Sequence, residues 1–145
     1  MFLLFCVCSV TAVKPQIKHL LTDQIKSKNW DIISKLEFRP KGEDELYPVY
    51  SPQLKERNGK FFELQGYMVP IENGMKHQKF ILSALPITQC DFCGQNGTPI
   101  LILVEMQNAI DYSVKPIFVR GVLTLNKGNV LDAMPIVLKR TQLVK

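Results

Sequence analysis

Two stretches of the sequence decide the fold: Glu63-Leu64-Gln65-Gly66-Tyr67-Met68 and Phe118-Val119-Arg120-Gly121-Val122-Leu123. Each stretch has the composition of a strand and carries one glycine near its centre, Gly66 in the first and Gly121 in the second. Glycine inside a strand weakens pairing unless the backbone must bend sharply or approach another segment closely. The long strands of a small closed barrel need such bending points to coil. The two stretches therefore predict a small β-barrel, with a short β-sandwich as the alternative.

The segments around these stretches supply the other strands. Five runs have strand length and strand composition, and they cover residues 61–70, 79–85, 100–106, 117–125 and 130–144. Asn73-Gly74 predicts a hairpin turn between the first two runs. The third run is apolar except for Glu105, which predicts a strand buried on both faces. Together with a short N-terminal helix, these runs indicate a mainly β fold, a small five-stranded OB-like barrel.

Helix and loop signals precede the strands. Residues 16–29 are polar and lysine-rich with apolar residues at helical spacing, so they form either a short amphipathic helix or a tether. Ser51-Pro52 predicts the start of a helix, with the serine as cap and proline in the first turn, and Asn58-Gly59 ends it. Residues 39–48 contain proline, glycine and three carboxylates, which indicates a loop.

The N-terminus has the character of an export signal. Residues 1–13 carry no charge and begin with an apolar run that is shorter than the roughly 20 residues a membrane-spanning helix needs. The small residues Val10-Thr11-Ala12 offer a cleavage site, so residues 1–12 are predicted to be a signal peptide, with a buried first strand as the alternative. Residues 13–29 then form the tether or short helix, and residues 30–145 form one domain. The predicted location is the periplasm or cell envelope.

Composition excludes several classes of protein. The chain has 145 residues, 46% of them hydrophobic and 21% charged, which fits a single globular domain. The net charge of +5 is mildly basic and has no dense basic run behind it. The sequence has no nucleophile elbow, phosphate loop, dinucleotide-binding glycine pattern or zinc-protease helix motif. We therefore expect a protein that is not an enzyme.

The sharpest motif is Cys90-Asp91-Phe92-Cys93, between the second and third strand runs. A Cys-x-x-Cys pair can form a disulfide, exchange thiols or supply two ligands to a soft metal such as zinc or copper. The Gly94-Gln95-Asn96-Gly97 segment that follows cannot start a helix, so the context of thioredoxin-like enzymes is missing. In an oxidising compartment a local disulfide is the plainest interpretation. The metal-binding and redox alternatives stay open.

Other residues give weaker signals. His77 follows the Asn73-Gly74 turn, and we expect it to be an exposed hairpin residue, with metal ligation as the alternative. Aromatic residues on the strands could stack nucleic acid bases, as in many OB barrels; they are Phe61, Tyr67, Phe80 and Phe118. We do not expect nucleic acid as a ligand, because aromatic strand residues usually belong to the core and an exported domain seldom meets nucleic acid.

The run Gly66-Tyr67-Met68-Val69-Pro70-Ile71-Glu72 resembles the bacterial domain of unknown function family 3299. The resemblance covers roughly residues 30–125 and includes the following apolar strand and the cysteine loop, where Cys90 is the best-matched position. It implies an exported or lipoprotein-like small β domain, and metal handling as a working hypothesis. Within the run, Gly66 would permit a bend, Tyr67 and Met68 would face opposite sides, and Pro70 would end the strand.

The same run places Glu72 at the barrel rim. If the cysteine loop approaches that rim, then Glu72, His77, Cys90 and Cys93 would gather in one place. Three functions stay open: an envelope binding or accessory domain in metal handling, a thiol–disulfide redox protein, and a structural adaptor of an envelope complex. The expected partner is an envelope protein, a small ligand or a metal. Contact with a membrane is expected only through export or a lipid anchor.

Overall fold

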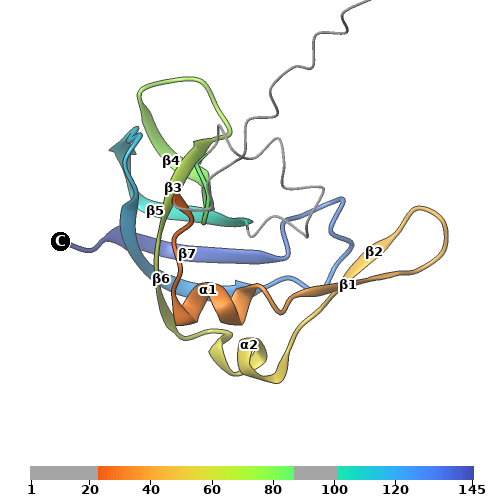
Figure 1. Cartoon of the computed structure of the whole chain (residues 1–145). Coiled ribbons are helices and arrows are strands. Elements are labelled where there is room, and N and C mark those ends of the chain that lie inside the picture. The colour runs from red at the N-terminus through yellow and green to blue at the C-terminus, as the bar shows by residue number, and fades with distance from the viewer. Residues whose placement is uncertain (1–22, 87–100) are drawn as a thin grey trace, which may run out of the picture.

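A computed structural model describes residues 23–86 and 101–145, and its centre is a closed barrel. The barrel strands are β3 (Phe61–Pro70), β4 (Lys76–Ser83), β5 (Leu101–Asp111), β6 (Ile117–Leu125) and β7 (Ile136–Leu143). They follow the order β3-β4-β5-β7-β6, and β6 pairs back with β3 to close the ring (Figure 1). Among the described strands, β5 and β7 are the one pair that runs in parallel. Three strands in sequence followed by a fourth that returns beside the first is a Greek key, so the predicted OB-like barrel is confirmed.

Two short helices cover one end of this barrel (Figure 1). They are α1 (Lys28–Ile33) and α2 (Pro52–Arg57). The helix α2 starts where the sequence predicts, because the Ser51 side chain accepts a hydrogen bond from the Leu54 N–H at 3.3 Å. In the described part of the chain, neither helix is long and apolar enough to cross a membrane.

A two-stranded hairpin lies between the helices, where the sequence predicted a loop. Its strands are β1 (Glu37–Pro40) and β2 (Leu46–Val49), and only residues 41–45 form the turn. The expectation for residues 39–48 is therefore wrong. The proline, glycine and carboxylates that indicated a loop sit in or beside the turn, and four-residue strands are too short to show a periodicity of their own.

The side chains of α1 fill the gap beside the first half of β3. That strand pairs with β4 only from Tyr67 onward. Before that point, the Trp30 indole Nε1 donates to the Gln65 carbonyl at 2.8 Å, and the Asn29 amide donates to the Glu63 carbonyl at 2.6 Å. Trp30 is buried and belongs to the core. The helix therefore replaces a missing strand with side-chain hydrogen bonds and apolar packing.

The two strand glycines lie where the sequence places them, on the inner side of the wall. A Cβ atom on Gly121 would come within 2.5 Å of the Thr141 Oγ1 and 2.8 Å of the Lys139 carbonyl oxygen. A Cβ atom on Gly66 would come within 2.6 Å of the Leu82 Cγ. Ordinary Cβ contacts are much longer, so both positions need glycine for close approach of neighbouring strands.

The strand β5, which contains most of the apolar run over residues 100–106, is buried on one face only. Its residues alternate: Ile102, Val104 and Met106 are buried in the barrel, whereas Leu101 and Leu103 are only half-buried. The prediction of a strand buried on both faces is wrong. A barrel wall has the core on one side only, so its outward residues stay partly accessible.

Replacing Gly121 with alanine should lower the free energy of unfolding by about 1–3 kcal/mol, because the added methyl group overlaps Thr141 and the backbone of β7. Urea denaturation measures the change. Gly128→Ala is the matched control, since nothing lies within 4 Å of its added Cβ atom. Equal stability of the two variants would contradict the close approach of β6 and β7.

Replacing Tyr50 with phenylalanine should cost about 1–3 kcal/mol at neutral pH, because its hydroxyl donates to the carbonyls of Pro135, at 2.8 Å, and Asn126. Burial raises the pKa of Tyr50 from 10.0 to about 12. The folded state thus holds the phenolic proton more tightly than the unfolded state does. The stabilisation is complete below pH 10 and is lost as the pH rises toward 12.

Denaturation curves across this alkaline range check the assignment. The wild type should lose more stability than Tyr50→Phe over the same interval. The difference between their free energies of unfolding should therefore become smaller. If this difference in free energy stays constant from neutral to alkaline pH, the buried hydroxyl does not titrate as described.

Candidate functional site

The end of the barrel opposite the helices is formed by two connections. Residues 71–75 join β3 to β4, and residues 112–116 join β5 to β6. The Tyr112 N–H donates to the Met75 carbonyl at 2.9 Å, so the two connections lie side by side (Figure 1). We call these two connections together the rim.

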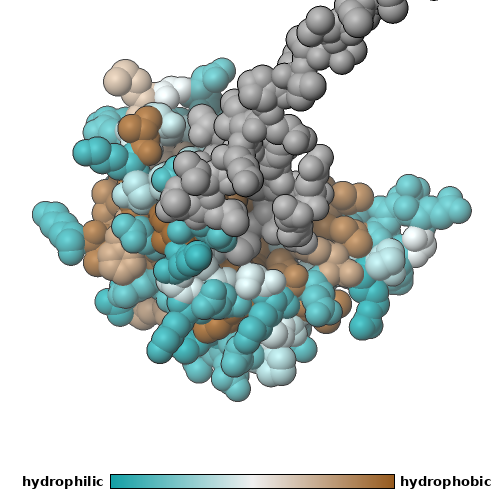
Figure 2. All heavy atoms as spheres, viewed as in Figure 1, coloured by the Kyte–Doolittle hydropathy of each residue, from teal (hydrophilic) through white to brown (hydrophobic). Residues whose placement is uncertain are grey.

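The rim exposes four large apolar side chains. Met75 is 83% exposed, Val114 76%, Ile71 45% and Tyr112 42%. Figure 2 shows hydrophobic atoms standing among hydrophilic ones at this end of the molecule. Single exposed apolar residues are common, but a group of them on two adjoining connections is a candidate interaction surface.

His77 lies directly behind the rim and is buried, not exposed as the sequence suggested. Only 3% of the residue is accessible, and its Nε2 atom has no hydrogen-bond partner among the described residues. The ring meets the edge of Tyr112 at a centroid distance of 6.3 Å. The expectation failed because β4 begins at Lys76, three residues before the predicted run, so that His77 is a strand residue facing inward. An unpaired buried imidazole nitrogen is costly to keep.

The residues of the Gly-Tyr-Met-x-Pro run occupy one wall that leads to the rim. Tyr67 is half-buried and its hydroxyl donates to the Asp23 carbonyl at 3.0 Å, whereas Met68 is buried in the core. Pro70 is the last residue of β3. Glu72 lies exposed in the rim itself, close in sequence to Ile71 and Met75.

Cys90 and Cys93 fall outside the described residues, so the gathering of Glu72, His77 and both cysteines at one place stays a prediction. Within residues 23–86 and 101–145, no group of three His, Cys, Asp or Glu side chains is arranged to hold a metal ion.

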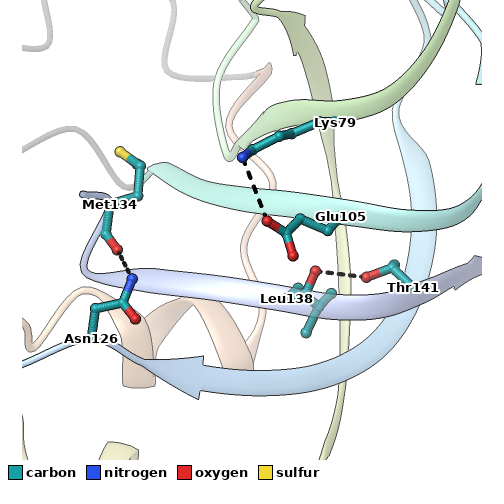
Figure 3. Close-up of polar contacts among 6 residues, drawn as sticks. All are labelled: Lys79, Glu105, Asn126, Met134, Leu138 and Thr141. Carbon is teal, nitrogen blue, oxygen red and sulfur yellow. Dashed lines mark hydrogen bonds and ion pairs between the residues drawn. The ribbon is translucent and has the colours of Figure 1, made fainter. Parts of the chain in front are cut away.

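The strand carboxylates make ion pairs on the outer surface. Glu105 lies 3.5 Å from the Lys79 Nζ across β4 and β5 (Figure 3), and Glu63 lies 3.7 Å from the Arg120 Nε across β3 and β6. All four side chains are substantially exposed, so each pair contributes little to stability. Each carboxylate faces a cation, which does not suit an acid and base working as a pair.

The connection between β6 and β7, residues 126–135, lies at the helical end. Hydrogen bonds between its own residues fix its conformation. The Asn126 side-chain amide donates to the Met134 carbonyl at 2.6 Å (Figure 3), and the Asn126 backbone N–H donates to the Pro135 carbonyl at 2.8 Å. The Tyr50 hydroxyl donates to the carbonyls of Asn126 and Pro135. This connection is therefore a structural element of the barrel.

Sequence reasoning missed the apolar residues of the rim. Met75 directly follows the Asn73-Gly74 turn, and Val114 sits between Ser113 and Lys115. Large apolar residues inside segments of turn composition were the available signal, because such segments usually lie in water. Only the barrel topology shows that the two segments are neighbours.

Comparison of the chain with protein-family models, curated proteins and solved structures found no match. The rim offers apolar surface and a buried imidazole with one unused hydrogen-bonding position. In the described residues, this arrangement suits recognition of another molecule more than catalysis or metal binding.

Replacing His77 with leucine should leave the free energy of unfolding unchanged or raise it by about 1 kcal/mol, because the change removes an unpaired buried polar atom. Urea denaturation again measures it. Leu82→Ala on the same strand is the control and should lose about 2–5 kcal/mol, since Leu82 is fully buried in the core. A clear loss of stability in His77→Leu would mean that the imidazole is a structural hydrogen-bonding group.

Proposed function

We propose that this chain is an exported binding domain of the bacterial cell envelope that uses its rim to dock on an apolar segment of a partner protein. The prediction of export rests on the apolar N-terminus and on the resemblance to exported bacterial domains. The prediction of docking rests on the structure of the rim. Of the three functions that the sequence left open, the structural adaptor of an envelope complex thus becomes the leading one.

The observation that carries this proposal is the exposure of Ile71, Met75, Tyr112 and Val114 at one end of the barrel. These side chains project from short connections whose backbones are joined by the hydrogen bond between Tyr112 and Met75. A pre-formed apolar surface loses little conformational freedom on binding, which favours association. Anchors of this kind dominate the binding energy of protein interfaces.

The unpaired nitrogen of His77 supports a specific contact at the same place. Keeping an unsatisfied polar atom behind the rim lowers stability, and such costs persist where function requires them. A partner side chain that reaches Nε2 would supply the missing hydrogen bond. The apolar surface would then provide affinity and His77 would provide selectivity.

The fold is compatible with this assignment. OB barrels commonly bind ligands with the connections between their first and second strands and between their fourth and fifth strands, and with the face of the second and third strands. The connection between β3 and β4, with Ile71 and Met75, holds the first of these places in this barrel.

Site-specific photo-crosslinking in the native host should test the rim. A photoreactive phenylalanine analogue at position 75 or 114 should give one discrete protein adduct in the envelope fraction. The same analogue in place of exposed Glu56 on α2, at the other end of the barrel, should give none. Ile71→Asp should abolish the adduct, because a carboxylate on the apolar surface disfavours burial.

Two outcomes would contradict the proposal. Equal labelling from all three positions would show that the rim is not a preferred contact. An adduct of twice the mass of the chain would show that the partner is a second copy of the same protein.

The metal-handling and redox functions depend on Cys90 and Cys93 and stay predictions from the sequence. They are compatible with a docking domain, because they depend on residues that do not belong to the rim. Intact mass with and without thiol alkylation, together with metal analysis of the purified protein, distinguishes a disulfide from free or metal-bound thiols.

A further inference from the structure

The outer surface of β3, β6 and β7 forms a second distinct surface, on the side wall of the barrel. Pairing places its residues in rows across the three strands: Phe61 beside Val122 and Val122 beside Lys139, then Glu63 beside Arg120 and Arg120 beside Gln142. Gln65 lies beside Phe118 in the next row. We call this surface the basic face; it comprises Phe61, Glu63, Gln65, Phe118, Arg120, Val122, Lys139, Arg140 and Gln142.

Two phenylalanines stand exposed on the basic face. Phe61 is 65% and Phe118 is 39% exposed, although a phenylalanine usually lies inside a protein. The Arg120 guanidinium lies 4.7 Å from the centre of the Phe61 ring. The two rings are thus held on a paired sheet among cationic side chains, and not on a flexible loop.

The charges of this face are mainly positive. Arg120, Lys139 and Arg140 face one carboxylate, Glu63, which pairs with Arg120. Lys139 and Arg140 are adjacent in the sequence yet both exposed, because Arg140 and Thr141 form a bulge of β7 opposite Gly121. Arg140 has a φ of 51°, which is unusual for a residue other than glycine. The bulge therefore presents a second cation on the outer surface.

We propose that the basic face docks on the surface of an anionic phospholipid membrane. Exposed aromatic rings enter the interface between headgroups and acyl chains, and the surrounding cations contact lipid phosphates. The outer wall of a barrel is convex, and a lipid surface is deformable enough to make contact along it. A single-stranded nucleic acid would instead favour a groove that tracks its backbone. The charge of the face and the position of its rings together favour a lipid.

This inference is independent of the proposed partner at the rim. The rim lies on the two connections at one end of the barrel, whereas the basic face lies along the wall formed by β3, β6 and β7 (Figure 1). One protein could therefore contact a membrane with its wall and a partner with its end. Either contact can fail in an experiment without the other.

Co-sedimentation of the purified mature protein with lipid vesicles tests the proposal. The protein should bind vesicles that contain phosphatidylglycerol and should bind vesicles of pure phosphatidylcholine at least about tenfold more weakly, because the latter carry no net charge. High salt should weaken the binding. Equal binding to both vesicles, or to neither, would overturn the proposal.

Two double variants distinguish the effect of charge on the basic face from the effect of the net charge of the protein. Lys139→Glu with Arg140→Glu should weaken binding to the anionic vesicles by at least about tenfold. Lys55→Glu with Arg57→Glu, on exposed α2, changes the net charge by the same amount and should have a much smaller effect. Equal losses in the two variants would show that net charge, and not this face, attracts the lipid.

Phe61→Ala with Phe118→Ala tests the aromatic part while leaving every charge in place. Vesicle binding should fall several-fold, and urea denaturation should confirm that the variant is folded. Unchanged vesicle binding would overturn the role of the rings. Tighter binding of a single-stranded oligonucleotide than of anionic vesicles, lost in the same variants, would assign the face to nucleic acid instead.

Discussion

The close approach of β6 and β7 at Gly121 is the constraint on which the rest of this barrel depends. The backbone and side chains of β7 come so near that no Cβ atom fits there. Because this contact brings β6 against β7 while β6 also pairs with β3, it completes the ring. The bulge opposite Gly121 follows from the same contact, with Thr141 turned into the core and Arg140 turned outward. One glycine thus links closure of the fold to the charge of its outer wall.

Closure of the ring also makes the two ends of the barrel different. One end is covered by α1 and α2, whose residues Trp30 and Leu54 complete the core. At the same end, the Tyr50 hydroxyl forms hydrogen bonds to the connection between β6 and β7. Among residues 23–86 and 101–145, the other end carries two short connections and no helix that could cover their apolar side chains. The asymmetry of the barrel, more than any one residue, makes the rim the favoured place for a partner.

Prediction from the sequence succeeded where the signal is local. The helix cap at Ser51 and the strand over Ile117–Leu125 each depend on residues close together in the chain. The burial of His77 instead requires neighbours from β5, and the rim exists only because residues 71–75 and 112–116 meet in space. The hairpin of β1 and β2 was missed because its strands are too short for a pattern. The site was therefore less predictable than the fold, since a fold can be inferred from local patterns and a site needs their arrangement.

The narrowness of the barrel decides where function can reside. Even an eight-stranded barrel is only just wide enough to be filled by side chains or to hold one small ligand. The five-stranded interior of this one is occupied by residues such as Phe80, Ile102, Leu123 and Leu138, all fully buried. A ligand must therefore meet the protein at an end or on the outer wall. Those are the places where the described chain exposes apolar side chains that its own core does not use.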